Sequence, residues 1–354
     1  MIHSFYPPLD GWVLITDAQG MKQAFDDLNL SLELRRAVER LSNRIGSDPQ
    51  HRMLVDELAS SITSRDQNRV ALLLNQGLNE FGSLYPLVAI AQMWETIGSV
   101  FETLGLDEET RLGTLGDINL WIDHHREANN GENGLSRVFW VNRLITARII
   151  QFGRLQFEER LFPYPVILYQ DPRSDFVAIP QSGLALDSSG YLTRDEKKFI
   201  RLTNEHEYVH LEKGSIASLK RDLPTLTKLA DSTTSVLFVH IPASGSLEPS
   251  LVDQSLEQAQ MFFGGGRLYV CTSWLLDPAL SKVVEAESNI WLFNQRFKKL
   301  PVFFDSAQIF ERVFDGVDEE SVPLFDATTS LQRNAQRALN EGVVFRTMGG
   351  FFLR

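Results

Sequence analysis

The spacing of apolar residues divides the chain into two regions. From about residue 17 to residue 150, apolar side chains recur every three or four positions, as in Leu34, Val38 and Leu41, which is the period of an amphipathic helix. Segment 84–104 is apolar on most sides and predicts a central, buried helix. The first region is therefore expected to be entirely helical.

The second region, after about residue 151, has the pattern of strands separated by helices. Its short runs rich in Phe, Val, Ile and Tyr are broken by Pro and Gly, which is typical of strands and turns. Pro249 suits the first turn of a helix that Gly264 ends, and Ser330 suits the cap of another that Gly342 ends. The strands are predicted at 166–169, 236–241, 268–271, 302–304 and 343–352.

These patterns predict an α+β protein with two domains. An all-helical domain over residues 1–147 is followed by a mixed α/β domain over residues 148–354. The length of 354 residues and the hydrophobic fraction of 43% fit two globular domains and exclude fibrous and disordered classes.

The charge balance and the single cysteine limit the partners. Lys and Arg total 34 against 46 Asp and Glu, and acidic residues are in excess in both regions. We therefore expect no nucleic-acid partner, because phosphate backbones are bound by basic surfaces. No apolar run approaches the ~18 residues of a membrane span, so no membrane partner is expected. One cysteine, Cys271, and a start without a basic segment predict a cytoplasmic protein.

Three segments carry a resemblance to a known family. They are 153–158 (GRLQFE), 239–242 (VHIP) and 271–278 (CTSWLLDP), in that order along the chain. With them the chain resembles bacterial acyltransferase-domain proteins, which have an all-helical N-terminal domain and a GNAT-like C-terminal domain. The resemblance implies that residues 148–354 form a GNAT-like domain, and that acyl-CoA or acetyl-CoA is the co-substrate.

The resemblance also implies a place for the diphosphate of that co-substrate. In GNAT-like folds a strand, a loop and a helix N-terminus hold it, because free backbone N–H groups and the helix dipole favour anions. The loop 242–246 departs from the general pattern of Gln or Arg, two residues, Gly, one residue, and Gly or Ala. Glu248 and Asp253 also add negative charge near the helix start. The equivalent cofactor-binding residues here are Ile241, Ala243, Ser244, Gly245 and Ser246.

Three residues are candidates for catalysis. His240 suits acid-base work, because imidazole titrates near neutral pH and a strand end is where an α/β sheet places ligands. Glu158 would accept a proton through water, and Ser273 would donate to the acyl carbonyl or the leaving thiolate. Burial of His240 in the sheet is the structural alternative.

Other residues in these segments suit substrate binding or packing. Arg154, Gln156 and Glu158 are spaced by two, so in a strand their side chains share one face. That face would either line a polar pocket or hold an ion pair of Arg154 with Glu158. Trp274 would contact substrate or pack between strand and helix, and Cys271 is expected to pack as a small apolar residue.

A zinc site is the competing motif. His206-Glu207-Tyr208-Val209-His210 matches the pattern in which two histidines four apart on a helix bind zinc and the glutamate activates water. Tyr208 and Val209 favour a strand instead. There the two histidines would lie about 13 Å apart, too far to share one ion. We therefore expect no metal.

The sequence predicts an N-acyltransferase that transfers an acyl group from acyl-CoA to the amine of a small molecule. The alternative is a GNAT-like domain that has lost catalysis and acts as a small-molecule sensor or scaffold. The departure of loop 242–246 from the general pattern favours that alternative, and a zinc hydrolase ranks third. The acyl acceptor, the acyl chain and the oligomeric state stay open.

Overall fold

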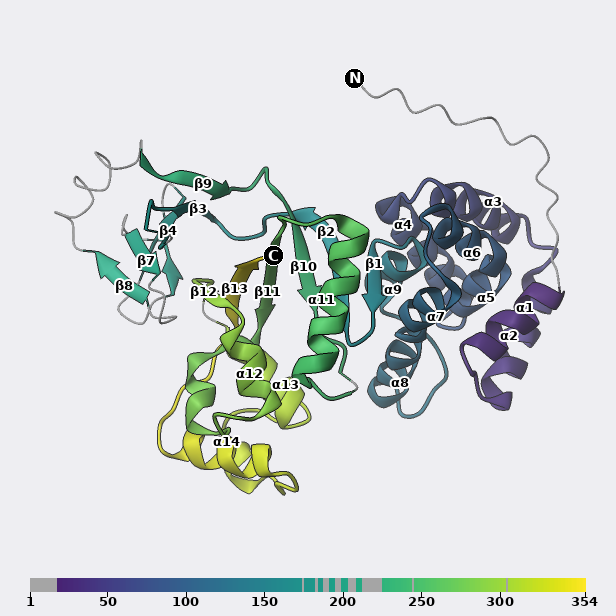
Figure 1. The fold of residues 1–354 in the computed structure, drawn as a ribbon. Helices are drawn as coiled ribbons and strands as arrows, with labels where there is room; N and C mark the ends of the chain where they lie inside the picture. The colour runs from purple at the N-terminus through teal and green to yellow at the C-terminus, as the bar shows by residue number, and fades with distance from the viewer. Residues whose placement is uncertain are drawn as a thin grey trace. The chain divides into compact units, whose positions relative to one another are not determined.

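The computed structural model describes residues 18–354 apart from 174, 182–183, 187–190, 195–198, 203–207, 212–224, 244 and 304. The chain forms two compact units, residues 1–150 and 151–354. Figure 1 shows helices in the first and two sheets with flanking helices in the second. Each unit is described below by itself.

The elements of the first unit are helices throughout its described residues, up to strand β1 at its end. Asp48 and Asp66 cap α3 and α4, each accepting hydrogen bonds from free amides of the first turn. The predicted buried helix 84–104 is two helices that meet at Met93, whose N–H is shared between Ala89 O and Ile90 O. The helices are α1 (Ala18–Asp27), α2 (Leu32–Ile45), α3 (Pro49–Thr63), α4 (Gln67–Phe81), α5 (Tyr85–Gln92), α6 (Trp94–Thr103), α7 (Glu108–Gly116), α8 (Ile118–Ala128) and α9 (Val138–Ile145).

The second unit is built on two sheets. Within the described residues, a six-stranded sheet has the order β1-β2-β10-β11-β13-β12 and a five-stranded sheet has the order β8-β7-β4-β3-β9. The strands of the first are β1 (Ile149–Phe152), β2 (Leu155–Leu161), β10 (Ser235–His240), β11 (Leu268–Ser273), β13 (Met348–Leu353) and β12 (Lys298–Leu300). Those of the second are β8 (Tyr208–Leu211), β7 (Phe199–Leu202), β4 (Phe176–Pro180), β3 (Val166–Gln170) and β9 (Thr227–Ala230), and β5 (Ala185–Leu186) pairs with β6 (Leu192–Thr193).

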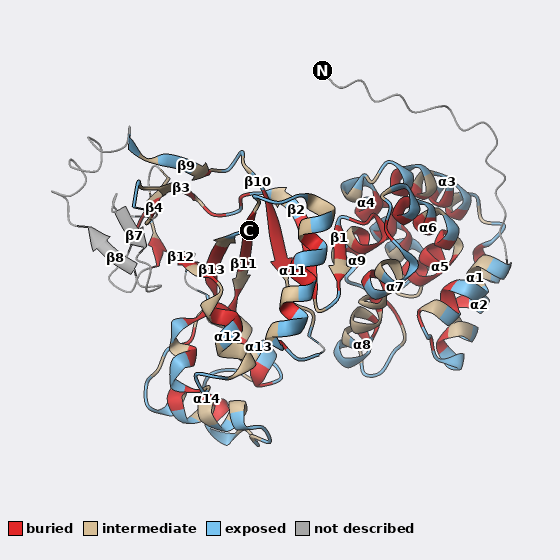
Figure 2. Ribbon diagram, viewed as in Figure 1, coloured by how far each residue is buried: buried red, intermediate tan, exposed pale blue. Residues whose placement is uncertain are grey.

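Helices cover one face of the six-stranded sheet and the second sheet packs on the other. Phe152 contacts Phe157 of β2 and Phe262 of α11 (Pro249–Phe263), so α11 lies on the face that carries Phe157. On the opposite face Phe238 and Val270 join one buried cluster with residues of β3 and β4. The central strands are therefore buried on both sides, as Figure 2 shows in red. The other helices are α12 (Asn289–Gln295), α13 (Ala307–Val313) and α14 (Ser330–Asn340), with short 3-10 turns η2 (Trp274–Leu276), η3 (Pro278–Lys282) and η4 (Val322–Leu324).

Some element boundaries differ from the prediction. The run 302–304 was predicted as a strand, but β12 lies at Lys298–Leu300 and Phe303 only forms an isolated bridge with Leu192. Strand β13 is shorter than the predicted run 343–352 at its beginning. Thr329, not Ser330, caps α14, through a capping box with Gln332.

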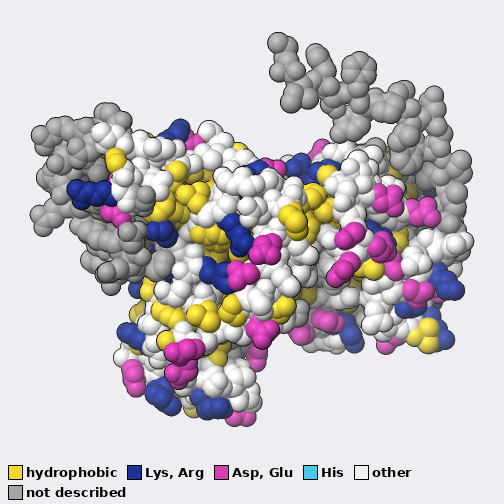
Figure 3. Space-filling view, in the orientation of Figure 1, with side chains coloured by type: hydrophobic (Ala, Val, Ile, Leu, Met, Phe, Trp, Pro, Cys, Tyr) yellow, Lys and Arg dark blue, Asp and Glu magenta, His cyan; other side chains and the backbone are white. Residues whose placement is uncertain are grey.

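The visible surface carries both signs of charge. Figure 3 shows Lys and Arg intermingled with Asp and Glu on the face in view. Among the described residues, none of the helices combines the length and the apolar character that crossing a membrane would require.

Gly350 in β13 should tolerate no side chain. A Cβ there would lie 2.8 Å from Leu276 Cδ1 and 2.9 Å from Phe297 Cβ. We expect Gly350→Ala to lower the free energy of unfolding by about 1–3 kcal/mol, the usual cost of overpacking, as measured by urea unfolding. Gly113→Ala is the control: its Cβ meets nothing within 4 Å in helix α7, and better helix propensity should raise stability by roughly 0.5–1 kcal/mol. Equal stability of the Gly350→Ala variant and the wild type would contradict the packing.

The buried His51 should make stability depend on pH. Its ring is 3% exposed and lies edge-on to Phe81 and Tyr85. Burial lowers the pKa of His51 below 6.5, against the attraction of Asp48. Below pH 6.5 the unfolded chain binds a proton at His51 more readily than the folded chain does. The contribution of neutral His51 to the free energy of unfolding is therefore fully present above pH 6.5 and is lost as the pH falls below that value. Urea unfolding of wild type and His51→Gln at pH 7 and pH 5 should show a smaller decrease in the variant; an equal decrease would assign the effect to other groups.

Candidate active site

The pairing of β2 with β10 brings His240 and Glu158 together. In the antiparallel register His240 lies opposite Gln156 and Phe238 lies opposite Glu158, so all four side chains share one face of the sheet. His240 Nε2 lies 3.1 Å from Glu158 Oε2. The Glu158 side chain is 5% exposed and that of His240 is 13% exposed. The two predicted acid-base residues therefore form a pair in which Glu158 is buried and His240 is half-buried.

Arg160 and Phe238 complete the surroundings of this pair. Arg160 Nη1 lies 3.9 Å from Glu158 Oε2, and its guanidinium lies over the Phe238 ring at 5.2 Å. The His240 ring lies 4.8 Å from the same ring. Phe238 thus orients both side chains, and Glu158 has two groups able to offset its buried charge. Arg160 did not figure among the predicted site residues, although it continues the spacing of two from Arg154 through Glu158.

The hydrogen bond to Glu158 sets the proton arrangement of neutral His240. A carboxylate is an acceptor, so Nε2–H donates to it and Nδ1 carries the lone pair. In this form the imidazole can accept a proton at Nδ1 while Glu158 stabilises the resulting imidazolium. The pair therefore has the chemistry of a general base with an orienting carboxylate.

The central strands β10 and β11 stop pairing beside this pair. They run parallel and are matched at Leu237 with Tyr269 and at Phe238 with Val270. Beyond that point β10 stays paired with β2 up to His240, and β11 stays paired with β13 up to Ser273. The two strands consequently diverge at the carboxyl end of β10, the edge where α/β sheets place ligands.

Arg154 lies in the turn before β2 and binds the loop after β10. Its Nη2 donates to Pro242 O and Gly245 O, both at 3.0 Å, and its Nε donates to Ser246 O at 2.9 Å. Its backbone N–H donates to Ser255 Oγ of α11 at 2.8 Å. The structure thus brings Arg154 to the predicted cofactor loop, while its role toward substrate stays a prediction.

The predicted cofactor-binding residues lie in that loop. Ala243, Gly245 and Ser246 are exposed and Ile241 is half-buried, whereas Ser244 lies outside the described residues. Gly245 has a φ of +88°, which glycine adopts without strain. Helix α11 follows with Glu248 at its N-cap, and that side chain makes no capping hydrogen bond.

Ser273 lies apart from the His240–Glu158 pair. It is three residues beyond Val270, which shares the face of Phe238, so alternation puts Ser273 on the opposite face. Its Oγ accepts a hydrogen bond from Leu275 N–H at 3.1 Å and caps η2. A catalytic role for Ser273 stays a prediction.

Gln156 and Trp274 are held by neighbouring side chains. Gln156 is 1% exposed and donates to Gln151 Oε1 at 3.2 Å. Trp274 is half-buried against a second apolar cluster, and its backbone N–H donates to Gln308 Oε1 at 3.1 Å. Binding of substrate by either residue stays a prediction.

Cys271 of β11 and Lys299 of β12 are buried in the core. Cys271 is 1% exposed, and burial raises the pKa of its thiol to about 12. Lys299 is 2% exposed, and burial lowers its pKa to about 7. Lys299 Nζ donates to Asn294 O and Phe297 O, where α12 ends. Both residues hold the core together.

The zinc motif lies only partly within the described residues. Tyr208–Leu211 forms strand β8, as expected for this segment, and His206 and Glu207 lie outside the described residues. Elsewhere in the described chain, no group of three or more His, Cys, Asp or Glu could hold a metal ion. That the motif binds no zinc stays a prediction.

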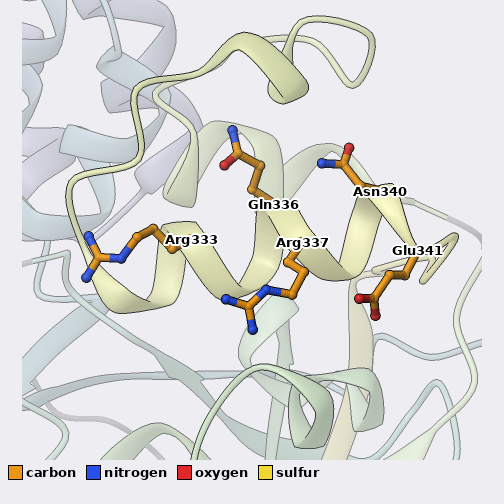
Figure 4. A pocket seen from close by; sticks show the side chains of 5 residues that line it. All are labelled: Arg333, Gln336, Arg337, Asn340 and Glu341. Atoms are coloured by element: carbon orange, nitrogen blue, oxygen red, sulfur yellow. The ribbon is translucent and has the colours of Figure 1, made fainter.

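A hollow on the surface of α14 is separate from these residues. It is lined by Arg333, Gln336, Arg337 and Asn340 of α14 and by Glu341, the C-cap of that helix (Figure 4). Arg333 donates to Thr328 O and Gln336 donates to Val322 O and Phe325 O, so both hold neighbouring loops. The hollow contains none of the predicted site residues.

A helical unit followed by a sheet with diverging central strands defines the class of two-domain, GNAT-like proteins. Family profiles agree: the GNAT-like C-terminal domain matches residues 149–352, and the N-acyltransferase N-terminal domain matches residues 20–147. The chain belongs to the family that combines these two domains. No curated protein matches it.

Solved structures share the fold over nearly the whole chain. An acyltransferase mutant in complex with octanoyl-CoA matches with a TM-score of 0.60 and 16% identity, covering 98% of this chain and 91% of that one. An acyltransferase in complex with decanoyl-CoA matches with a TM-score of 0.58 and 18% identity over 98% and 91%. An acyltransferase in complex with decanoyl-CoA and teicoplanin gives 0.57 and 18% over 98% and 90%. These likenesses show that both units have the acyltransferase fold.

Proposed function

We propose that the protein transfers an acyl group from an acyl-CoA to the amine of a small molecule. The observation that carries the proposal is the divergence of β10 and β11 beside the His240–Glu158 pair. Diverging strands leave backbone groups that an extended acyl-pantetheine arm can pair with, as in strand addition. Family membership and the acyl-CoA complexes of proteins with this fold support the same reaction.

The proposed reaction is direct transfer. The amine nitrogen attacks the thioester carbonyl, His240 Nδ1 accepts the proton, and backbone amides polarise the carbonyl oxygen. The C–N bond forms, the C–S bond breaks, and the leaving CoA sulfur takes up a proton. A thioester on Cys271 is disfavoured, because its thiol is buried and its raised pKa keeps it protonated.

The second candidate is a sensor or scaffold that binds acyl-CoA without turnover. One observation favours it: the loop has a single glycine and is followed by Glu248 at the N-cap of α11. A carboxylate at a helix N-terminus competes with a bound diphosphate. Activity measurements separate the two candidates.

Incubation of the full chain with acetyl-, octanoyl- or decanoyl-CoA and a panel of small amines should release CoA. A thiol reagent measures the release, and the buried Cys271 should contribute little background in the native protein. The same acyl-CoA should raise the melting temperature by mass action. A raised melting temperature without release would favour the sensor, and neither effect would contradict both candidates.

His240→Gln should lower turnover by roughly 10²-fold, the usual scale for losing a general base. Glu158→Gln should cause a smaller loss, because it removes the charge that stabilises the imidazolium but keeps a polar partner. Arg337→Gln, on the exposed face of α14, serves as the matched control and should keep full activity. Circular dichroism checks folding of each variant. Full activity of a folded His240→Gln variant would eliminate His240 as the base.

A further inference from the structure

One arginine, Arg154, donates hydrogen bonds to three carbonyls of the loop between β10 and α11. Arg154 is separated from Pro242, Gly245 and Ser246 by about ninety positions, yet its guanidinium binds all three carbonyl oxygens at 2.9–3.0 Å. Its backbone N–H also binds Ser255 in α11. The arginine thus ties strand β2, the loop and the helix together.

Because peptide bonds are planar, the direction of these carbonyls also fixes the direction of the N–H groups that follow them. In a trans peptide the carbonyl of one residue and the N–H of the next point in opposite directions. Because the three carbonyls point toward Arg154, the N–H groups of Ala243, Ser246 and Leu247 point away from it. Within the described part of the chain these N–H groups have no hydrogen-bond acceptor. Among the described residues, they are therefore donors that a ligand could accept from.

Neighbouring groups add to this set of donors. The first amides of α11, at Ser250 and Leu251, also have no acceptor among the described residues, as is usual where a helix begins without a side-chain cap. The positive φ of Gly245 lets the chain reverse there. Arg154 Nη1 is buried and has no partner among the described residues.

The local charges are less unfavourable than the sequence indicates. Of the two acidic residues near the start of α11, Asp253 is paired with Arg296 at 2.6 Å, and Glu248 makes no capping hydrogen bond. Arg154 brings a positive charge to the opposite side of the same loop. The net field at the amides is consequently compatible with an anion.

We propose that Arg154 is a positioning residue that shapes this loop to receive the diphosphate of acyl-CoA. The proposal rests on the proposed function, since it concerns the co-substrate of that reaction. An arginine outside the loop does here what glycines inside the loop do in the general pattern: it sets the direction of the amides. In this proposal Arg154 acts on the binding of the diphosphate and takes no part in the attack on the thioester.

The test compares ligands with and without the diphosphate. Calorimetric titration of wild type and Arg154→Ala with CoA, 3′-dephospho-CoA and pantetheine compares two ligands that contain the diphosphate and the adenosine with one that lacks both. We expect the variant to bind CoA and dephospho-CoA at least about tenfold more weakly, the scale of one lost hydrogen bond to a charged group, and pantetheine unchanged. An equal loss for pantetheine, or unchanged CoA affinity in a folded variant, overturns the proposal.

Two further variants guard against a folding defect. Gly245→Ala keeps Arg154 but disfavours the φ of +88°, and it should show the same ligand selectivity. Arg333→Ala is the matched control, because Arg333 also binds loop carbonyls, at Ala327 and Thr328, but near α14; it should bind all three ligands as wild type does. A Gly245→Ala variant with unchanged CoA affinity counts against the proposal.

The binding experiment also separates this proposal from the proposed function. Wild type that binds CoA through Arg154 but releases none from acyl-CoA would support the positioning role and contradict acyl transfer. If wild type turns over acyl-CoA and the Arg154→Ala variant has the same KM for acyl-CoA as wild type, the result supports acyl transfer and contradicts the positioning role. Wild type that neither binds CoA nor turns over acyl-CoA would overturn both.

Discussion

The candidate site depends on the point at which β10 and β11 stop sharing hydrogen bonds. Backbone N–H and C=O groups in a sheet interior must be paired, because an unpaired buried group costs about as much as a lost hydrogen bond. Here the two strands are matched only as far as Phe238 and Val270, and each then continues beside its outer neighbour. Beyond Val270 the Cys271 carbonyl accepts a hydrogen bond from Tyr164 Oη, and we propose that other backbone groups on the inner edges pair with the co-substrate. The divergence also lies beside the end of β10, where we propose that substrate binds.

Strand alternation then decides which side chains take part. The antiparallel register of β2 with β10 puts Glu158 and His240 on one face, and the parallel register of β10 with β11 puts Ser273 on the other. A shift of one residue in either register would move the side chains of the shifted strand to the opposite face of the sheet. Burial makes the pairing with Glu158 stronger than it would be in water, but a buried carboxylate needs compensation. Arg160, held over the Phe238 ring, supplies part of it.

The helical first unit and the positions of β3, β10 and β11 could be predicted from sequence, because they depend on local periodicity. Strand β12 was not predicted, and it contains Lys298 and Lys299, a residue type that is depleted in strands. Lys299 is in fact buried, since two carbonyls at the end of α12 accept hydrogen bonds from its Nζ. The break between α5 and α6 at Met93 was not predicted, because it lies within a continuous apolar run and is seen only in the hydrogen bonds. The partners of Arg154 lie about ninety positions away, where no local pattern reaches them.

The loop after β10 shows why a motif is a weaker guide than the hydrogen bonds it normally produces. Glycines recur in diphosphate loops because they allow the backbone to turn its amides toward the anion. The physical requirement is the direction of the amides, and any group that holds the carbonyls on the far side meets it. Arg154 holds three of them from the turn before β2, and the proposal therefore requires only one glycine in the loop, at the position where φ is positive. The absence of a consensus glycine therefore does not by itself imply that the loop has lost its diphosphate ligand. The hydrogen-bond partners of the loop carbonyls must be known first.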